Sequence, residues 1–258
     1  MTAQLAAMRT PSWQTAAGVL SAALLVGLPA AAGEFSVSPI RLDLGPSVRS
    51  GVIEVRNSSS EQQRFQIEAV EWLQDANGKD RYGPTRDLVF FPKIMSLQPD
   101  EEGVVRVGLR MPAAPVERTY RLFIEELPGK KAAPASGAQI EVLLRFGVGI
   151  FAAPSLPQDG LAIDAFEVTT GSIEVSAQNS GNRHHVVKSV EFRGTDAAGN
   201  PTYRLDVADR YLLAGTRKTY SASMSAEQCR GTATLAVEIR TERVSAARKI
   251  EITPAMCP

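Results

Sequence analysis

Residues that could perform acid–base or nucleophilic chemistry are sparse in this chain. Its only histidines, His184 and His185, are adjacent, and neighbouring residues on an extended strand point to opposite faces. They cannot readily share a metal ion, so we interpret them as a solvated turn before a strand. No nucleophile elbow, phosphate-binding loop, HExxH sequence or glycine-rich dinucleotide turn is present. The sequence predicts no enzyme activity, no catalytic residue, no cofactor and no metal site, and a hydrolase is the weakest hypothesis.

The chain has two cysteines, Cys229 and Cys257. Residues 232–243 and 249–253 resemble a final antiparallel hairpin, with one cysteine before it and the other after it. Pairing of those strands would bring the two cysteines together, and the spacing fits a disulfide that closes the open end of the hairpin. Two unpaired thiols are the alternative. Zinc held by these cysteines alone is improbable, because zinc usually takes four ligands.

The N-terminal segment, residues 1–33, differs in composition from the remainder. Arg9 is its only charge, residues 16–28 form an apolar run, and the small residues Ala30, Ala31 and Ala32 follow. This order is typical of a cleavable export signal, with cleavage expected after Ala32. A retained membrane anchor is the alternative. No later segment is apolar enough to span a bilayer, so we expect a soluble mature protein without stable membrane insertion.

The balance of positive and negative residues excludes a strong electrostatic field of one sign over the whole chain. The 258 residues include 28 Lys and Arg and 28 Asp and Glu, so the net charge is zero. Nucleic acid is therefore not an expected partner. Any electrostatic function must be local.

Apolar and polar residues alternate with a period of two along most of the mature chain. Short alternating runs separated by turn residues predict an all-β protein built from antiparallel sandwiches. A segment with two prolines and a glycine, residues 153–160, divides the mature chain near its middle. The predicted strands are residues 51–57, 64–72, 103–110, 120–127, 173–179 and 186–192.

One predicted strand, residues 139–152, follows a flexible loop at residues 130–137. It has apolar residues at consecutive alternate positions, which would share one face. The strand could be a central one with that face in the core. Alternatively, it could be an edge strand whose free backbone groups and apolar row serve to pair with another protein. The residues of this row are Ile140, Val142, Leu144, Phe146 and Val148, followed by Ile150.

Several segments, taken in order, resemble the PapD-like family of pilus assembly chaperones. They are residues 37–44, Trp72, Pro92, residues 97–107 and residues 120–128. The similarity covers residues 35 to about 155, whereas the second half matches in length, strand style and cysteines alone. The resemblance implies two immunoglobulin-like β-sandwich domains set at an angle with a cleft between them. The expected divisions are a signal peptide at 1–33 and domains at 34–154 and 155–258.

The resemblance also implies a function and a site. Such chaperones complete pilus or fimbrial subunits by donor-strand complementation in the Gram-negative periplasm, and they deliver them to an outer-membrane usher. The row from Ile140 to Val148 would be the donor strand, and the free edge could also pair with a second copy. The family anchors the subunit's C-terminal carboxylate with two basic residues. Arg41 matches the first, but Gly149 stands where the second, a lysine, is expected, so Arg145 is the candidate replacement.

A different class of protein would share many of these features. A structural or adhesive immunoglobulin-like protein, itself a component of a surface fibre, would also have the strands and the disulfide. It would not need Arg41, or a long loop before an apolar edge. Recovery from sheared fibres would favour this alternative over the chaperone.

Overall fold

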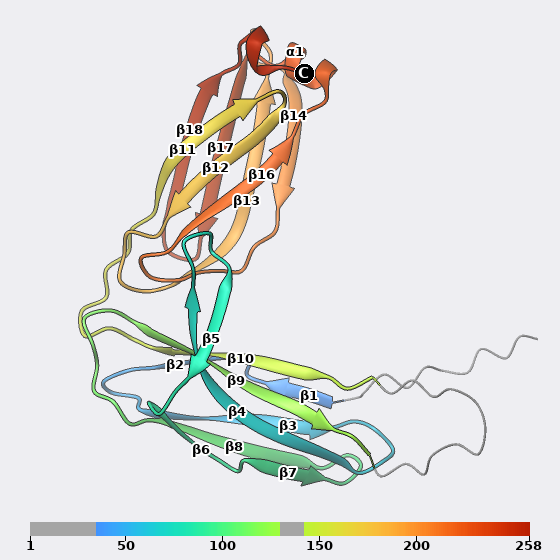
Figure 1. The fold of residues 1–258 in the computed structure, drawn as a ribbon, viewed down its shortest axis with the longest axis vertical. Coiled ribbons are helices and arrows are strands. Elements are labelled where there is room, and N and C mark those ends of the chain that lie inside the picture. The colour runs from blue at the N-terminus through green and yellow to red at the C-terminus, as the bar shows by residue number, and fades with distance from the viewer. Residues whose placement is uncertain (1–34, 130–141) are drawn as a thin grey trace, which may run out of the picture. The chain divides into compact units, whose positions relative to one another are not determined.

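The computed structural model describes residues 35–129 and 142–258, and they form two β-sandwiches joined end to end in the chain (Figure 1). The export segment at 1–33, the loop at 130–137 and Ile140 lie outside the described residues. None of the described helices is long and apolar enough to cross a membrane. The all-β prediction is confirmed.

The N-terminal sandwich has a four-stranded sheet, in the order β1-β3-β8-β6, and a six-stranded sheet. The larger sheet has the order β2-β10-β9-β4-β5, and β7 also pairs with β4. The strands are β1 (Phe35–Ser38), β2 (Arg41–Leu44), β3 (Ser50–Asn57), β4 (Gln63–Gln74), β5 (Asp80–Pro84), β6 (Leu88–Phe91), β7 (Ile94–Leu97), β8 (Glu102–Leu109), β9 (Arg118–Leu127) and β10 (Arg145–Ala152).

Alternating side chains on these strands build the first core. In β3, for example, Ile53 and Val55 are buried. Their neighbours along the strand, Val52 and Glu54, are exposed. The two sheets therefore bury one face each, as a period of two requires. Pro39 and Ile40 separate the first two strands, so that β1 belongs to one sheet and β2 to the other.

The C-terminal sandwich pairs a three-stranded sheet, β11-β12-β16, with a five-stranded sheet, β14-β13-β17-β18, in which β15 also pairs with β13. It has its own core of buried apolar side chains. Its strands are β11 (Ala162–Thr169), β12 (Ser172–Gln178), β13 (His185–Thr195), β14 (Pro201–Val207), β15 (Tyr211–Leu212), β16 (Arg217–Ser223), β17 (Thr234–Thr241) and β18 (Ser245–Glu251).

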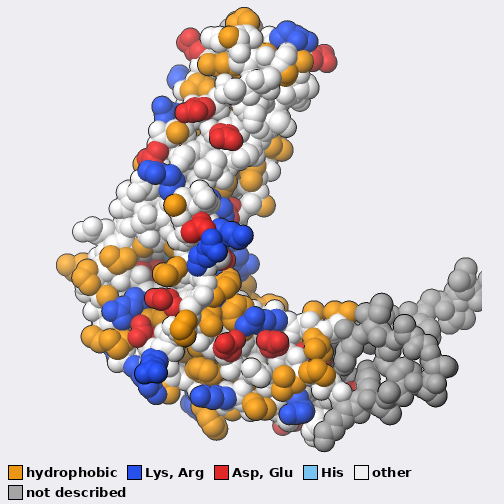
Figure 2. Space-filling model, in the orientation of Figure 1, with side chains coloured by type: hydrophobic (Ala, Val, Ile, Leu, Met, Phe, Trp, Pro, Cys, Tyr) orange, Lys and Arg blue, Asp and Glu red, His pale blue; other side chains and the backbone are white. Residues whose placement is uncertain are grey.

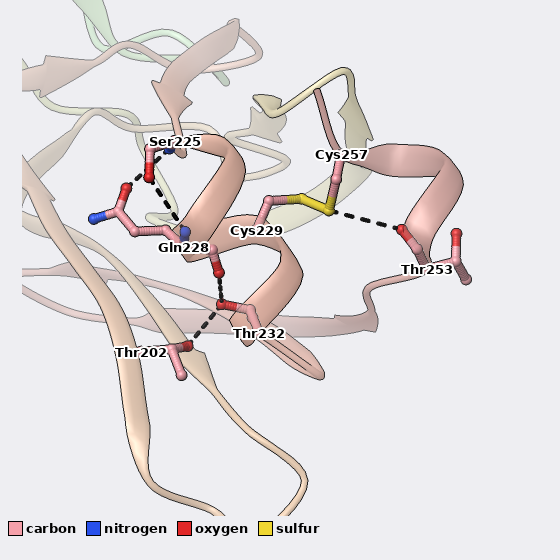
Figure 3. The surroundings of a disulfide bond; sticks show 7 residues. All are labelled: Thr202, Ser225, Gln228, Cys229, Thr232, Thr253 and Cys257. Atoms are coloured by element: carbon pink, nitrogen blue, oxygen red, sulfur yellow. Dashed lines mark hydrogen bonds between the residues drawn. A yellow bond between two sulfur atoms is a disulfide. The ribbon is translucent and has the colours of Figure 1, made fainter.

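A disulfide joins Cys229 to Cys257 and confirms the predicted pairing (Figure 3). Cys229 is the buried residue of helix α1 (Ala226–Gly231), which begins with a reciprocal cap between Ser225 and Gln228. Cys257 follows the 3₁₀ turn η1 (Pro254–Met256). Since β17 and β18 are antiparallel neighbours, the bond closes the open end of their hairpin. A loop of this length is typically stabilised by about 2–4 kcal/mol.

A third, smaller cluster of buried side chains links the two sandwiches. Trp72 and Phe151 come from the first, whereas Tyr211 and Leu213 come from the second. The Gln74 side chain adds two hydrogen bonds, donating to the Tyr211 carbonyl at 3.1 Å and accepting from the Leu213 amide at 2.9 Å. The side-chain amide of Gln74 therefore bonds to the backbone around β15 much as a neighbouring strand would.

The interpretation of the two histidines as a solvated turn was wrong. His184 and His185 are 1% and 0% exposed. The His184 ring stacks on Phe151 of the first sandwich, with ring centres 3.7 Å apart, and its Nδ1 lies 2.6 Å from a buried Glu117 carboxylate oxygen. The contact with the other sandwich buries the His184 ring, whereas His185 Nε2 lies 3.1 Å from the Gly160 carbonyl oxygen. A local sequence pattern shows neither contact.

Candidate functional site

The strand β10 is paired along its whole length on one side and only in part on the other. Its partner β9 runs antiparallel to it from Arg145 to Ala152. On the opposite side, β2 pairs with it in parallel over residues 149–152 alone. Residues 142–148 thus have no strand partner on that side within the described residues, and we call this segment the free edge.

Burial falls steeply along the apolar row of the free edge. Val148 is fully buried in the first core. Phe146 is 40% exposed, Leu144 37% and Val142 61%. The row leaves the sandwich at Phe146, whose ring meets Phe35 of β1 edge-on at 6.4 Å. Three apolar side chains thus stand partly in water along an edge that no described strand pairs, which is a template for strand pairing.

This arrangement corrects the predicted donor row in two respects. Val148 lies beside Leu122 of β9 and is fully buried in the first core, so its side chain cannot be presented to a partner. The regular strand begins at Arg145 rather than at residue 139, and Val142 and Leu144 precede it as exposed residues outside regular secondary structure. The described part of the candidate row is therefore Val142, Leu144 and Phe146, while Ile140 stays a prediction.

Exposed apolar side chains are not confined to this edge. Figure 2 shows several hydrophobic patches over the N-terminal sandwich, with Lys and Arg side chains among them. What distinguishes the free edge is that its apolar row and its unpaired backbone coincide.

A hollow of about 290 Å³ adjoins the free edge, and we call it the arginine hollow. It is lined by Ile40, Arg121, Arg145, Phe146, Gly147 and Arg210. Phe146 and Gly147 belong to the free edge, so the apolar row leads directly to a site rich in positive charge. Guanidinium groups in such a site suit carboxylates, which they can bind with two parallel hydrogen bonds.

Neither predicted anchor residue has a free charge. Arg41 pairs with Asp43 at 2.8 Å and with Glu242 at 3.3 Å. Burial alone would lower the pKa of Arg41, but these two carboxylates raise it. Arg145 pairs with Glu68 at 2.9 Å and with Glu125 at 3.2 Å, and it lies over the Phe123 ring.

Arg121 was not among the predicted site residues. It faces Gly149 across the β9–β10 ladder, and Arg41 faces the same glycine from β2. Its guanidinium stacks 3.7 Å from the Trp72 ring centre and donates to the Gly147 carbonyl at 3.3 Å. No ion pair holds Arg121 within residues 35–129 and 142–258. Its signal in the sequence was the alternation of residues 120–127, which places it opposite the core face, but the register with Gly149 was not predictable.

Comparison with known proteins supports one family. Residues 34–157 match the description "Pili and flagellar-assembly chaperone, PapD N-terminal domain". A search of curated protein sequences gave no match. The match identifies the first sandwich as a PapD-like chaperone domain, and the predicted resemblance to the PapD-like family is confirmed.

Solved structures of fimbrial and pilus chaperones have the same fold. One is the CsuC–CsuE chaperone–tip adhesion subunit complex of Acinetobacter baumannii Csu pili, with 16% identity and a TM-score of 0.58 over 84% of this chain and 98% of that chain. The YadV chaperone has 10% identity and a TM-score of 0.57 over 84% and 98%. The Pseudomonas aeruginosa CupB2 chaperone has 16% identity and a TM-score of 0.53 over 84% and 100%.

Proposed function

We propose that this protein is a periplasmic chaperone that holds pilus subunits by lending them its free edge. In this proposal Val142, Leu144 and Phe146 fill apolar pockets in a groove of the subunit, while the unpaired backbone completes the subunit's sheet. The observation that carries the proposal is the coincidence, along one strand edge, of unpaired backbone with an apolar row that leaves the core.

The energetics of such pairing are favourable. Full burial of a large aliphatic or aromatic side chain contributes about 1.5–3 kcal/mol. Three such residues therefore offer several kcal/mol before the cost of ordering the edge and of association is subtracted. The backbone hydrogen bonds that β-augmentation adds satisfy groups which otherwise face water. A subunit with an incomplete sandwich would gain both contributions at once.

We also propose that the arginine hollow anchors the subunit's C-terminal carboxylate. Arg121 is the best-placed cation, because it has no ion pair among the described residues and lies beside Gly149, where a lysine was expected. Arg41, on the other side of that glycine, can contribute once a ligand competes with Asp43 and Glu242. Arg145 already has two carboxylate partners, so it is a weaker candidate than the sequence suggested.

The proposal includes export and domain organisation. Residues 1–33 would direct the chain to the periplasm and be removed. The domains would span residues 34–154 and 155–258, which agrees with the separate cores and with the match to residues 34–157. Delivery of the bound subunit to an outer-membrane usher would follow.

Co-expression with a pilus subunit encoded beside this gene tests the proposal. The tagged protein should yield a soluble one-to-one complex, and Val142→Asp with Leu144→Asp should abolish it without loss of thermal stability. The matched control is Leu156→Asp, since Leu156 is 76% exposed but lies beyond the sandwich edge. An intact complex in the double variant would overturn the donor-edge proposal.

A further inference from the structure

The C-terminal sandwich contributes a cation to the arginine hollow. Arg210 lies immediately before β15, is exposed, and lines the hollow together with Arg121 and Arg145 of the first sandwich. Its backbone is fixed, because its carbonyl accepts a hydrogen bond from the Val187 amide at 2.9 Å. The hollow is therefore built from both sandwiches rather than from the first alone.

Contacts between the sandwiches hold Arg210 in this place. Trp72 meets Tyr211, the neighbour of Arg210, edge-on with ring centres 5.3 Å apart. Gln74 bonds to the backbone of Tyr211 in β15 and of Leu213 directly after it. Strand β4 of the first sandwich thereby fixes the segment that carries Arg210, so the position of this side chain is a consequence of how the sandwiches join.

Two of the three arginines in the hollow have no carboxylate partner in the part of the chain that the structure describes. Arg145 is the exception, with Glu68 and Glu125. The guanidinium carbons of Arg121 and Arg210 lie 5.5 Å and 5.4 Å from the centre of the Tyr211 ring. Both residues line the same hollow, and an anion bound there would interact favourably with both charges.

We infer that Arg210 is the second cation of the anchoring site, acting with Arg121 on one carboxylate of the bound subunit. The second sandwich would then take part directly in client binding. The inference rests on the proposed function, because it names a further residue at the same site. The carboxylate could belong to the C-terminus of the subunit or to an acidic side chain, and the experiment separates these two sources.

The test uses the full chain co-expressed with the neighbouring pilus subunit. Arg210→Gln should weaken the complex roughly tenfold to a hundredfold, as expected for loss of a charge-assisted hydrogen bond, and should reduce its sensitivity to salt. Arg204→Gln is the matched control, since Arg204 is an exposed arginine of the same sandwich that pairs with Glu191. Thermal unfolding of both variants should match that of the parent protein.

The outcomes distinguish the inference from the function on which it rests. Absence of any complex with the parent protein would remove the proposed function itself. A complex that Arg121→Gln weakens and Arg210→Gln does not would overturn the inference alone. Extending the subunit by two C-terminal glycines moves its terminal carboxylate. If the extended subunit binds as tightly as the native one, and Arg210→Gln still weakens its binding, the carboxylate bound by Arg210 belongs to an acidic side chain.

Discussion

The guanidinium of Arg121 lies beside Gly149, which has no side chain to fill the adjoining space. A Cβ atom at position 149 would stand 3.7 Å from Nη1 of Arg121, and Arg121 faces this glycine directly in the strand ladder. Arg41 borders the same position from the other side. The glycine at the place where the family resemblance indicates a lysine is therefore flanked by arginines on both neighbouring strands, so the site keeps its positive charge.

Gly149→Ala should therefore destabilise the first sandwich and weaken subunit binding. The added Cβ would lie 3.0 Å from the ring of Phe151, which is itself buried against His184. Overpacking of this kind usually costs about 1–3 kcal/mol, and the effect should appear as a lower urea midpoint. Gly83→Ala is the control, because a Cβ there would meet no atom within 4 Å. Equal midpoints for the two variants would show that the space is not constrained.

Arg121→Gln should weaken subunit capture more than Arg145→Gln does. The charge of Arg121 has no ion pair among the described residues, whereas that of Arg145 is already balanced by Glu68 and Glu125. Hydrogen bonds to charged groups contribute about 1.5–3 kcal/mol, so a loss of roughly tenfold or more is expected for Arg121→Gln. Competition of each variant with the parent protein for a limiting amount of subunit measures the difference. A larger loss of capture in Arg145→Gln than in Arg121→Gln would identify Arg145 as the main anchor residue.

The strand alternation, the all-β class and the disulfide could be predicted from the sequence, because each depends on local spacing. The free charge of Arg121 could not, since it depends on which residues face each other across β9 and β10. The same holds for Val148, whose apolar character fits a core strand and a donor edge equally well. Burial along the strand places Val148 in the core, whereas the donor role of the exposed residues from Phe146 to Val142 stays a proposal.

The buried pair of Glu117 and His184 should stabilise the junction between the sandwiches. One Glu117 oxygen accepts from the His184 backbone amide at 2.8 Å and lies 2.6 Å from Nδ1 of its ring. The other Glu117 oxygen lies 2.8 Å from the same Nδ1. In Glu117→Gln one of the two oxygens is replaced by an NH₂ donor, and an unsatisfied buried polar group costs about 1–3 kcal/mol. We expect earlier urea unfolding and faster proteolysis of the junction. Glu54→Gln, at an exposed carboxylate, should change neither, and the hypothesis fails if the two variants behave alike.

The ion pair of Arg41 and Glu242 predicts a dependence of stability on pH. Burial alone would raise the pKa of Glu242 above its ordinary value of 4.5, but hydrogen bonds and charge from Arg41 and Lys188 outweigh it and lower the pKa. The folded state therefore favours the ionised carboxylate. Its contribution to stability is complete above the unfolded value and is lost as the pH falls through the lower folded value.

Glu242→Gln should consequently be less stable than the parent protein at pH 7 and equally stable once the pH is well below 4.5. Urea unfolding at both pH values measures the difference between the two proteins. The effect should also shrink in high salt, because Glu242 is partly exposed and solvent ions screen the pair. Glu54→Gln is again the control, since Glu54 has no ion pair in the described residues. A difference from the parent protein that is the same at both pH values would mean that Glu242 acts through packing rather than through its charge.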